Sequence, residues 1–215
     1  MKKYKVEFIE LALKRKAIKF GDFILKSGRK SPFFFNFGSF NTGYDLSLVG
    51  RYYAEALKDN EIDCDVVLGI AYKGIPIVVS MVIALSEYYN INMSYSFNRK
   101  EFKKYGEKGS LIGSSLKGRV LIVDDVITSG ASIYESIKFI EQKKAIISGV
   151  LLCLDRQEVG KNKMLATKEI ERKYCNVYSI ITINDLINYL SNFSCMKDHL
   201  FSLRVYHDRY KENIK

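Results

Sequence analysis

The sequence predicts an α/β fold in which a parallel central sheet is flanked by helices. Short apolar strands rich in β-branched residues alternate with segments of helical periodicity along most of the 215 residues, and this alternation is typical of crossover units that build a parallel sheet. Hydrophobic residues make up 47% of the chain, enough for a large core. Because no stretch rich in Pro, Gly or Ser offers a linker, we expect one domain over residues 1–215.

The first expected elements surround an aromatic segment. Residues 4–16 carry apolar side chains at helical spacing, and residues 20–25 follow as a strand. Residues 27–40 mix Gly, Ser and Pro with five phenylalanines, which predicts irregular backbone carrying aromatic rings. Residues 45–60 return to a helical pattern.

The rest of the chain alternates regularly. Strands are expected at residues 64–70, 93–97, 119–124, 146–154 and 177–181. Helices are expected at residues 75–89, 132–143, 165–174 and 184–190. Residues 98–117 are polar and contain glycines, which predicts a loop. The tail after Ser194 reads as a surface helix, in which His199 and His207 are structural or solvated. In parallel sheets the ligand site lies outside the carboxyl ends of the strands.

The composition narrows the class of protein. Widely spaced Cys64, Cys153, Cys175 and Cys195 predict reduced core thiols, not a zinc knuckle or a disulfide framework. The N-terminal residues lack the apolar core of a signal peptide, and the longest mostly apolar run, 75–85, is too short to span a bilayer. We therefore expect a soluble cytoplasmic protein. The net charge of +10 suggests an anionic partner, whether nucleic acid, acidic lipid or a polyphosphate substrate.

One segment, residues 120–132, carries the chemistry of a phosphate and ribose site. Two carboxylates, Asp124 and Asp125, end a predicted strand, and a turn of small residues then opens a helix. Backbone N–H groups at the positive end of that helix can converge on a phosphate, and Gly130 lets the backbone approach it closely. Hydroxyls of Ser132 and its neighbours add donors. No Walker motif occurs, which disfavours a P-loop nucleotide site.

The two carboxylates need a different partner. They would repel a phosphate, so we expect them to face vicinal ribose hydroxyls with Mg²⁺ nearby. An acidic pair alone could merely cap a helix. The ordered run of residue types favours the ligand site.

This segment resembles the motif with which type I phosphoribosyltransferases bind phosphoribosyl pyrophosphate (PRPP). The resemblance implies the fold of that family, a parallel central sheet with flanking helices and a small hood, here residues 1–40 with part of the C-terminal region. It implies PRPP contacts along the whole segment, namely Asp124, Asp125, Val126, Ile127, Thr128, Ser129, Gly130, Ala131 and Ser132. The metal ion would be held mainly by PRPP.

Four further stretches are similar to the bacterial orotate phosphoribosyltransferases, a branch of that family. They are Leu-Lys-Ser-Gly-Arg-Lys-Ser-Pro-Phe-Phe-Phe-Asn at 25–36, Ala-Tyr-Lys-Gly-Ile-Pro at 71–76, Phe-Asn-Arg-Lys-Glu at 97–101 and Leu-Asp-Arg-Gln-Glu at 154–158. The resemblance runs from about residue 4 to residue 190. It implies transfer of the phosphoribosyl group of PRPP to orotate, which gives orotidine 5'-monophosphate and pyrophosphate in pyrimidine biosynthesis.

The acceptor residues follow from these stretches. Phe34 and Phe35 can present a ring face and backbone groups to a flat heterocycle, and Arg156 can pair with the carboxylate of orotate. Phe33, Phe37 and Phe40 are expected in the core. The alternative for Arg156 is a surface ion pair with Glu158. The resemblance adds Lys26 and Thr128 to the orotate site, and it places Lys26, Tyr72 and Lys73 at PRPP.

Residues 99–114 are expected to form a mobile lid. Cations there would stabilise charge that grows on departing pyrophosphate, and closure would exclude water. The resemblance implies PRPP contacts from Arg99, Lys100, Lys103 and Tyr105, a homodimer that shares this loop, and a catalytic set of Lys103, Asp124 and Asp125. The family usually has His where this chain has Tyr105, so the contribution of that residue is open.

Two other functions remain open from the sequence. A phosphoribosyltransferase for another base would keep residues 120–132 but has no obvious use for Arg156. A regulator without enzyme activity could use the positive charge to bind RNA. We expect neither nucleic acid nor membrane as a partner.

Overall fold

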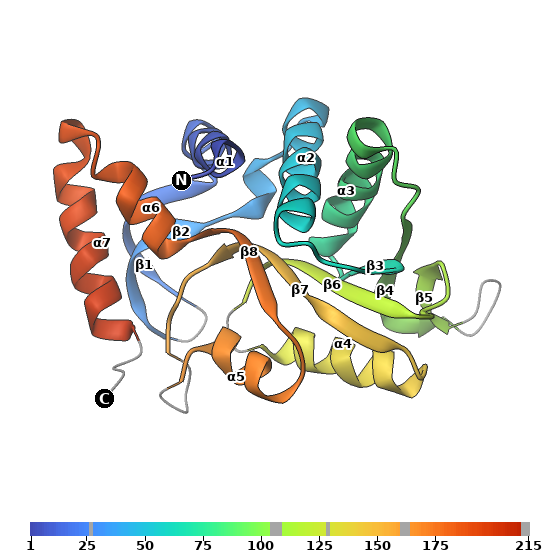
Figure 1. Ribbon diagram of the computed structural model, residues 1–215. Coiled ribbons are helices and arrows are strands. Elements are labelled where there is room, and N and C mark those ends of the chain that lie inside the picture. The colour runs from blue at the N-terminus through green and yellow to red at the C-terminus, as the bar shows by residue number, and fades with distance from the viewer. Residues whose placement is uncertain (26–27, 104–108, 128–129, 160–163, 212–215) are drawn as a thin grey trace.

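The central sheet of the computed structural model has the predicted α/β architecture (Figure 1). The structure describes residues 1–25, 28–103, 109–127, 130–159 and 164–211. Six strands lie in the order β5–β4–β3–β6–β7–β8, and all neighbours are parallel except β4 and β5. They are β3 (Val66–Gly69), β4 (Ser94–Lys103), β5 (Gly109–Gly113), β6 (Arg119–Val126), β7 (Ile146–Asp155) and β8 (Val177–Thr182).

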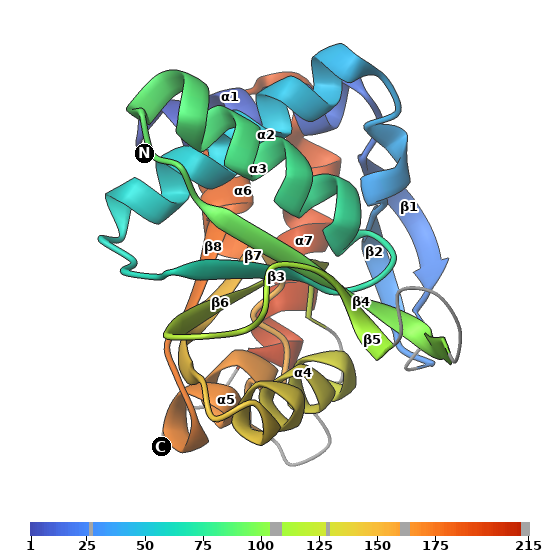
Figure 2. The same ribbon diagram turned by 90° about the vertical axis from the view of Figure 1, so that its right-hand side faces the viewer.

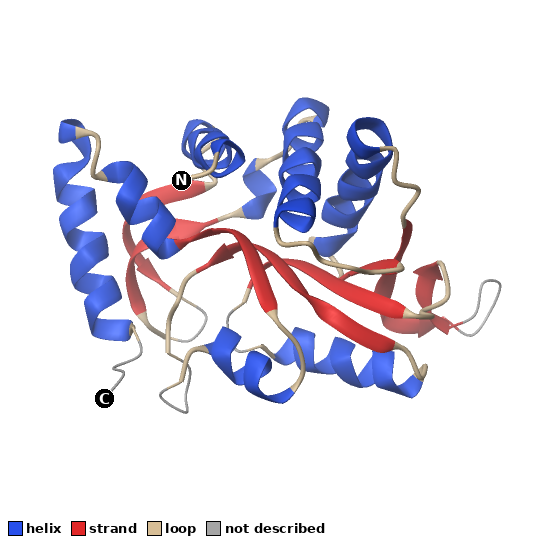
Figure 3. Ribbon diagram, viewed as in Figure 1, coloured by secondary structure: helices blue, strands red, loops and turns tan. Residues whose placement is uncertain are grey.

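Helices cover both faces of the sheet, as Figures 2 and 3 show from two sides. One layer contains α1 (Lys3–Lys14), α2 (Gly43–Asp59), α3 (Gly74–Tyr89) and α6 (Ile183–Leu190). The other contains α4 (Ala131–Gln142) and α5 (Ala166–Lys173). Successive side chains of a strand point to opposite faces of the sheet. Both faces are buried because a helix layer covers each of them. Leu121 and Val123 point into the first layer, whereas Val120 and Ile122 point into the second.

A separate two-stranded sheet forms the hood that the resemblance implied. Strands β1 (Ile18–Ile24) and β2 (Lys30–Phe35) pair antiparallel, and the short helix η1 (Phe37–Ser39) leads back toward α2. The C-terminal helix α7 (Lys197–Tyr210), which follows η2 (Ser194–Met196), lies beside β1 and β2 in Figure 1.

Two predicted irregular segments are strands in the structure. The prediction for 27–40 was wrong because residues 30–35 form β2, an edge strand that tolerates Pro32. The loop predicted at 98–117 was wrong because β4 continues to Lys103 and β5 returns antiparallel. This hairpin is largely polar, so it lacks the apolar alternation by which a half-buried strand is recognised.

Smaller expectations have mixed outcomes. Cys64 and Cys153 are buried free thiols as predicted, whereas Cys195 is exposed. Helix α7 exists but is not purely a surface helix, since Leu203 and Tyr206 are buried in the core. Among the described helices, none has the length and apolar character that crossing a bilayer requires.

Candidate active site

The carboxyl end of β6 places two acidic residues beside the first turn of a helix. Residues 120–123 of the strand are buried, and Asp124 and Asp125 are the next two residues of the same strand. Helix α4 begins at Ala131, after Gly130 with a positive φ of 74°. A residue with a Cβ would be strained there and would also press on the ring of Tyr134. The glycine therefore allows the tight turn that aims the helix N-terminus at this edge of the sheet.

Asp125 forms the principal ion pair of the site. Its side chain is buried, and Nζ of Lys73 donates a hydrogen bond of 2.6 Å to Oδ2. Lys73 precedes α3 on the neighbouring strand–helix turn, so two crossover units meet at this contact. The pair leaves half of the Lys73 side chain exposed and able to meet a ligand.

Asp124 has an unusual protonation equilibrium. The backbone N–H of Asp125 donates to its Oδ1 at 2.9 Å. Burial, and next the neighbouring charge of Asp125, raise the pKa of Asp124 to about 7. A carboxyl group poised in this range can hold or release a proton near neutral pH.

The turn after β3 is shaped by close backbone contacts. A Cβ on Gly69 would lie 2.3 Å from the carbonyl oxygen of Gly74, and one on Gly74 would lie 2.9 Å from the carbonyl oxygen of Val123. The two glycines therefore let this turn pack against β6. The N–H of Ala71 donates to Oδ1 of Asn98 at 2.7 Å, which ties the turn to β4. Tyr72 is 67% exposed and projects from this turn.

Tyr53, which was not predicted from the sequence, donates a hydrogen bond to the backbone of the acidic pair. This α2 residue is fully buried, and its hydroxyl donates to the carbonyl oxygen of Asp124 at 2.8 Å. The hydroxyl oxygen also lies 3.0 Å from Sγ of Cys153. Its only sequence signal is apolar helical spacing, which predicts core packing and not a hydrogen bond to the site.

Arg156 follows β7 and is only 7% exposed. Its Nε and Nη2 atoms each lie 2.7 Å from Oε1 of Glu158. Nη2 also donates to Oγ of Ser31 at 3.0 Å, and the guanidinium lies 3.9 Å from the ring centre of Phe33. The ion pair with Glu158, which the sequence offered as the alternative role for Arg156, is therefore present. It is not a surface pair, because the two side chains are only 7% and 14% exposed.

The hood strand β2 divides the aromatic residues between its two faces. Ser31, Phe33 and Phe35 are buried, whereas the Phe34 ring is 40% exposed and stacks on Phe23 at 5.6 Å. Since Arg156 contacts the buried face, the Phe34 ring lies on the opposite face from it. The Phe35 ring packs in the core, so a base could meet Phe35 only through its backbone groups. Phe33, Phe37 and Phe40 are buried as predicted.

The backbone of Phe35 points away from β1. The N–H of Asn36 donates to the carbonyl oxygen of Ala17 at 2.7 Å, which makes residues 17 and 36 a hydrogen-bonded pair. The adjacent pair, Ile18 and Phe35, is then a non-hydrogen-bonded pair whose N–H and C=O groups point outward. Phe35 can offer both groups from the open edge of β2.

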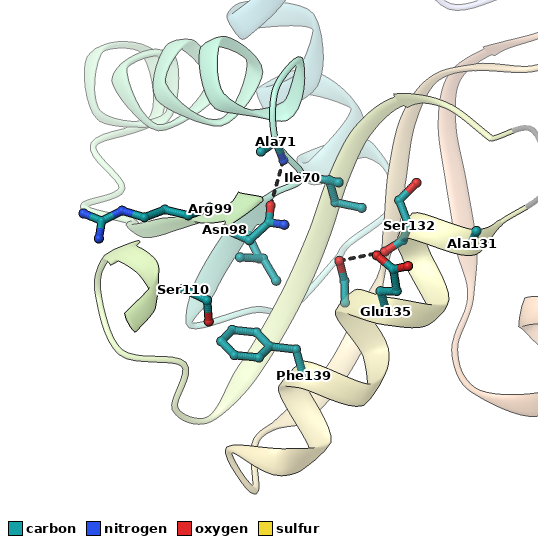
Figure 4. A pocket seen from close by; sticks show the side chains of 11 residues that line it. Ile70, Ala71, Asn98, Arg99, Ser110, Ala131, Ser132, Glu135 and Phe139 are labelled. Carbon is teal, nitrogen blue, oxygen red and sulfur yellow. Dashed lines mark hydrogen bonds between the residues drawn. The ribbon is translucent and has the colours of Figure 1, made fainter. Parts of the chain in front are cut away.

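A cavity of about 550 Å³ lies between the first turns of α4, the end of β3 and the β4–β5 hairpin (Figure 4). Its lining includes Ala71, Asn98, Arg99, Ala131 and Ser132. The predicted phosphate loop and predicted lid therefore share one hollow. The acidic pair and Arg156 do not line it.

Several predicted site residues cannot be placed. Lys26, Tyr105, Thr128 and Ser129 lie outside the described residues. Lys100 and Lys103 belong to β4, but their side chains lie outside the described part of the chain.

Fold and site together define a phosphoribosyl transferase domain, and the family model of that domain matches residues 45–189. The chain is 58% identical to the orotate phosphoribosyltransferase of Photorhabdus laumondii over 98% of this chain and 99% of the relative. It is 54% identical to that of Proteus mirabilis over 99% of this chain and all of the relative. The crystal structure of the Francisella tularensis enzyme matches with a TM-score of 0.86 and 38% identity, covering 95% of this chain and 99% of that one.

The chain belongs to the orotate phosphoribosyltransferase family. This confirms the predicted family, the fold with its N-terminal hood, and the predicted orotate phosphoribosyltransferase activity in pyrimidine biosynthesis.

Proposed function

We propose that this edge of the sheet carries the transfer of a phosphoribosyl group from PRPP to orotate, with separate residues for donor and acceptor. The observation that supports it most is the acidic pair near the end of β6, in which Asp125 is paired with Lys73, followed along the chain by Gly130 and the start of α4. Carboxylates suit the ribose hydroxyls, and a helix N-terminus suits the 5-phosphate. The order of these groups along β6 and α4 matches the order of groups on PRPP.

PRPP is proposed to lie along residues 124–132. Asp124 and Asp125 accept hydrogen bonds from the ribose hydroxyls, and the turn of residues 126–132 binds the 5-phosphate. Tyr72 and Lys73 meet the pyrophosphate end, which the half-exposed ammonium of Lys73 supports. Lys26 would add a cation from the hood.

The acidic pair also fits a magnesium ion that arrives with PRPP. Mg²⁺ binds oxygen ligands and typically combines one or two carboxylates with substrate phosphates. Asp124 and Asp125 supply such carboxylates, and no group of three or more potential ligand side chains occurs among the described residues. PRPP would therefore hold most of the coordination sphere. The bound ion would offset negative charge on the pyrophosphate.

Orotate is proposed to bind at the Arg156 side of the site. Its carboxylate pairs with the guanidinium, and Phe35 offers its backbone N–H and C=O groups from the open edge of β2. The Phe34 ring, on the other face of β2, could contact the base only after a change in the hood. Lys26 and Thr128 complete this set.

Arg99, Lys100, Lys103 and Tyr105 are proposed to close over the pyrophosphate. Arg99, Lys100 and Lys103 belong to β4, and Arg99 lines the same cavity as Ala131 and Ser132 at the start of α4 (Figure 4), which supports this proposal. Their charge would stabilise the departing group. We propose that the enzyme is a cytoplasmic homodimer in which this hairpin serves the neighbouring site.

The reaction needs no covalent enzyme intermediate. The ring nitrogen of orotate displaces pyrophosphate at the anomeric carbon, and the protein mainly positions the two reactants and stabilises charge. We propose that Asp124, whose pKa is about 7, accepts a hydrogen bond from a ribose hydroxyl as charge develops on the sugar.

The direct test is the fall in orotate absorbance on adding PRPP and magnesium. Uracil and hypoxanthine replace orotate in matched reactions. We expect turnover with orotate alone. Turnover only with another base would refute the acceptor assignment, and no turnover with any base would favour a regulator without enzyme activity.

A further inference from the structure

The guanidinium of Arg156 is held on one edge by contacts of Nε and Nη2. Nε donates to Oε1 of Glu158, Nη2 lies 2.7 Å from the same oxygen in an ion pair, and Nη2 donates to Ser31. The ring of Phe33 covers one face of the group at 3.9 Å. Nη1 donates no hydrogen bond to any of the described residues. It is also absent from the buried polar atoms that lack a partner. The Nη1 side is therefore the edge that remains for an incoming anion.

Glu158 is shared between two arginines. Oε1 faces Arg156, while Oε2 accepts a 2.8 Å hydrogen bond from Nη1 of Arg29. Two guanidinium groups and one carboxylate give the cluster a net charge of +1. A second carboxylate, such as that of orotate, would neutralise it.

The C-terminal helix α7 completes this cluster from the far end of the chain. The hydroxyl of Tyr206 donates to Oε1 of Glu158 at 2.8 Å, and its ring meets the edge of Phe33 at 6.2 Å. Arg29 lies 4.3 Å from the ring centre of Tyr210. The N–H of Val159 donates to the carbonyl oxygen of Tyr210 at 2.9 Å. Helix α7 thus contacts the hood and the loop after β7 together.

We infer that Tyr206 is a positioning residue for the acceptor: through Glu158 it holds the Arg156 guanidinium in the orientation that receives the substrate carboxylate. The inference rests on the proposed role of Arg156. Glu158 alone could rotate about its side-chain bonds and carry Arg156 with it. The Tyr206 hydroxyl and Arg29 fix both carboxylate oxygens, so the guanidinium is oriented before substrate binds and less ordering remains to be done on binding.

Tyr206→Phe removes this hydrogen bond and keeps the ring on Phe33. We expect the KM for orotate to rise about three- to tenfold, less than the direct loss of a hydrogen bond to a charged group, because Tyr206 acts through Glu158. The KM for PRPP, kcat and the melting temperature should stay close to the parent values. A matched control is Tyr4→Phe, because Tyr4 is a buried tyrosine whose hydroxyl donates to a remote carboxylate, Asp59, at 3.0 Å. This control should leave both KM values unchanged.

A double-mutant cycle with Arg156→Lys separates positioning from simple stability. A lysine cannot present the same planar edge, so Tyr206→Phe should add little further change in that background. Glu158→Gln provides a second variant, for which we expect a larger rise in the KM for orotate. The inference is overturned if Tyr206→Phe leaves the orotate KM unchanged, raises both KM values equally, or has its full effect in the Arg156→Lys protein. A parent that fails to consume orotate would instead contradict the proposed function.

Discussion

The donor side and the acceptor side of this site are assembled in opposite ways. The donor side is local: Asp124 and Asp125 are adjacent, the helix that follows starts at Ala131, and Lys73 is the main contribution from elsewhere. The acceptor side is distributed, since the contacts of Arg156 come from residues 31–33, from Glu158 and, through Glu158, from both Arg29 and the C-terminal helix.

The two sides also differ in charge. Two carboxylates and one ammonium leave the donor cluster with a net negative charge when Asp124 is ionised, whereas the arginine cluster is net positive. The negative cluster suits hydroxyls and a magnesium-bound substrate, and the positive cluster suits a carboxylate. On the proposed assignment each substrate has its own recognition group, so variants should impair one substrate at a time.

The largest expected effect is on the acceptor side. Arg156→Met should lower kcat/KM for orotate about 100- to 1,000-fold, because a buried charge-assisted contact is lost. Arg29 still pairs with Glu158 in this variant, so we expect the protein to fold. Initial rates with each substrate varied in turn provide the measurement. An equal rise in the KM for PRPP would contradict the separation of the two sides.

On the donor side, Lys73→Met should raise the KM for PRPP at least tenfold, about the contribution of one charge-assisted contact. The variant also leaves the buried Asp125 carboxylate without its cation, so we expect a loss of about 1–2 kcal/mol in the free energy of unfolding. Adding Asp125→Asn should restore much of the stability but not PRPP binding. Urea denaturation measures the change in stability, and initial rates measure the change in the KM for PRPP. Unchanged PRPP kinetics in Lys73→Met would contradict the donor assignment.

The pH dependence of stability tests the protonation of Asp124. Its pKa is about 7 in the folded protein against an ordinary 3.8, so between these values the folded state binds more protons than the unfolded state. Stability from this group is therefore present at low pH and is lost as pH rises toward about 7. Asp124→Asn should melt at a higher temperature than the parent above neutral pH and depend less on pH. Parallel melting curves for both proteins across this window would be inconsistent with a raised pKa.

The smallest expected effect concerns Tyr53, behind the donor side. Tyr53→Phe leaves a buried carbonyl oxygen of Asp124 without its 2.8 Å donor, which should cost about 1 kcal/mol of stability. We expect a modest rise in the KM for PRPP and none in the KM for orotate. A change confined to the KM for orotate would contradict the assignment of Tyr53 to the donor side.

The contrast explains how much of the site could be predicted from the sequence. The donor side depends on a contiguous run of residues. The strand, the acidic pair and the turn could therefore be predicted from residues 120–132 without any knowledge of tertiary contacts. Lys73 was also named, although the distance to Asp125 was not. Tyr53 was missed because its hydroxyl is significant only once α2 is packed against the end of β6.

The acceptor side could be predicted only in part from local sequence patterns. Arg156 and Glu158 are two residues apart, so their pairing could be considered, but burial beneath the hood could not be read from neighbours in sequence. Arg156 and Ser31, which form a hydrogen bond, are 125 positions apart, and Glu158 and Tyr206 are 48 positions apart. The fold itself was largely predictable because apolar strands and amphipathic helices repeat, whereas β2 and the β4–β5 hairpin lack that signal.

A crystal structure of this protein with orotate and a non-reactive PRPP analogue would test the central claim most directly. We predict the orotate carboxylate on the Nη1 side of Arg156, the contacts of Arg156 and Tyr206 with Glu158 retained, and the ribose hydroxyls at Asp124 and Asp125. An orotate carboxylate bound away from Arg156, or ribose bound away from the acidic pair, would contradict the division into donor and acceptor sides.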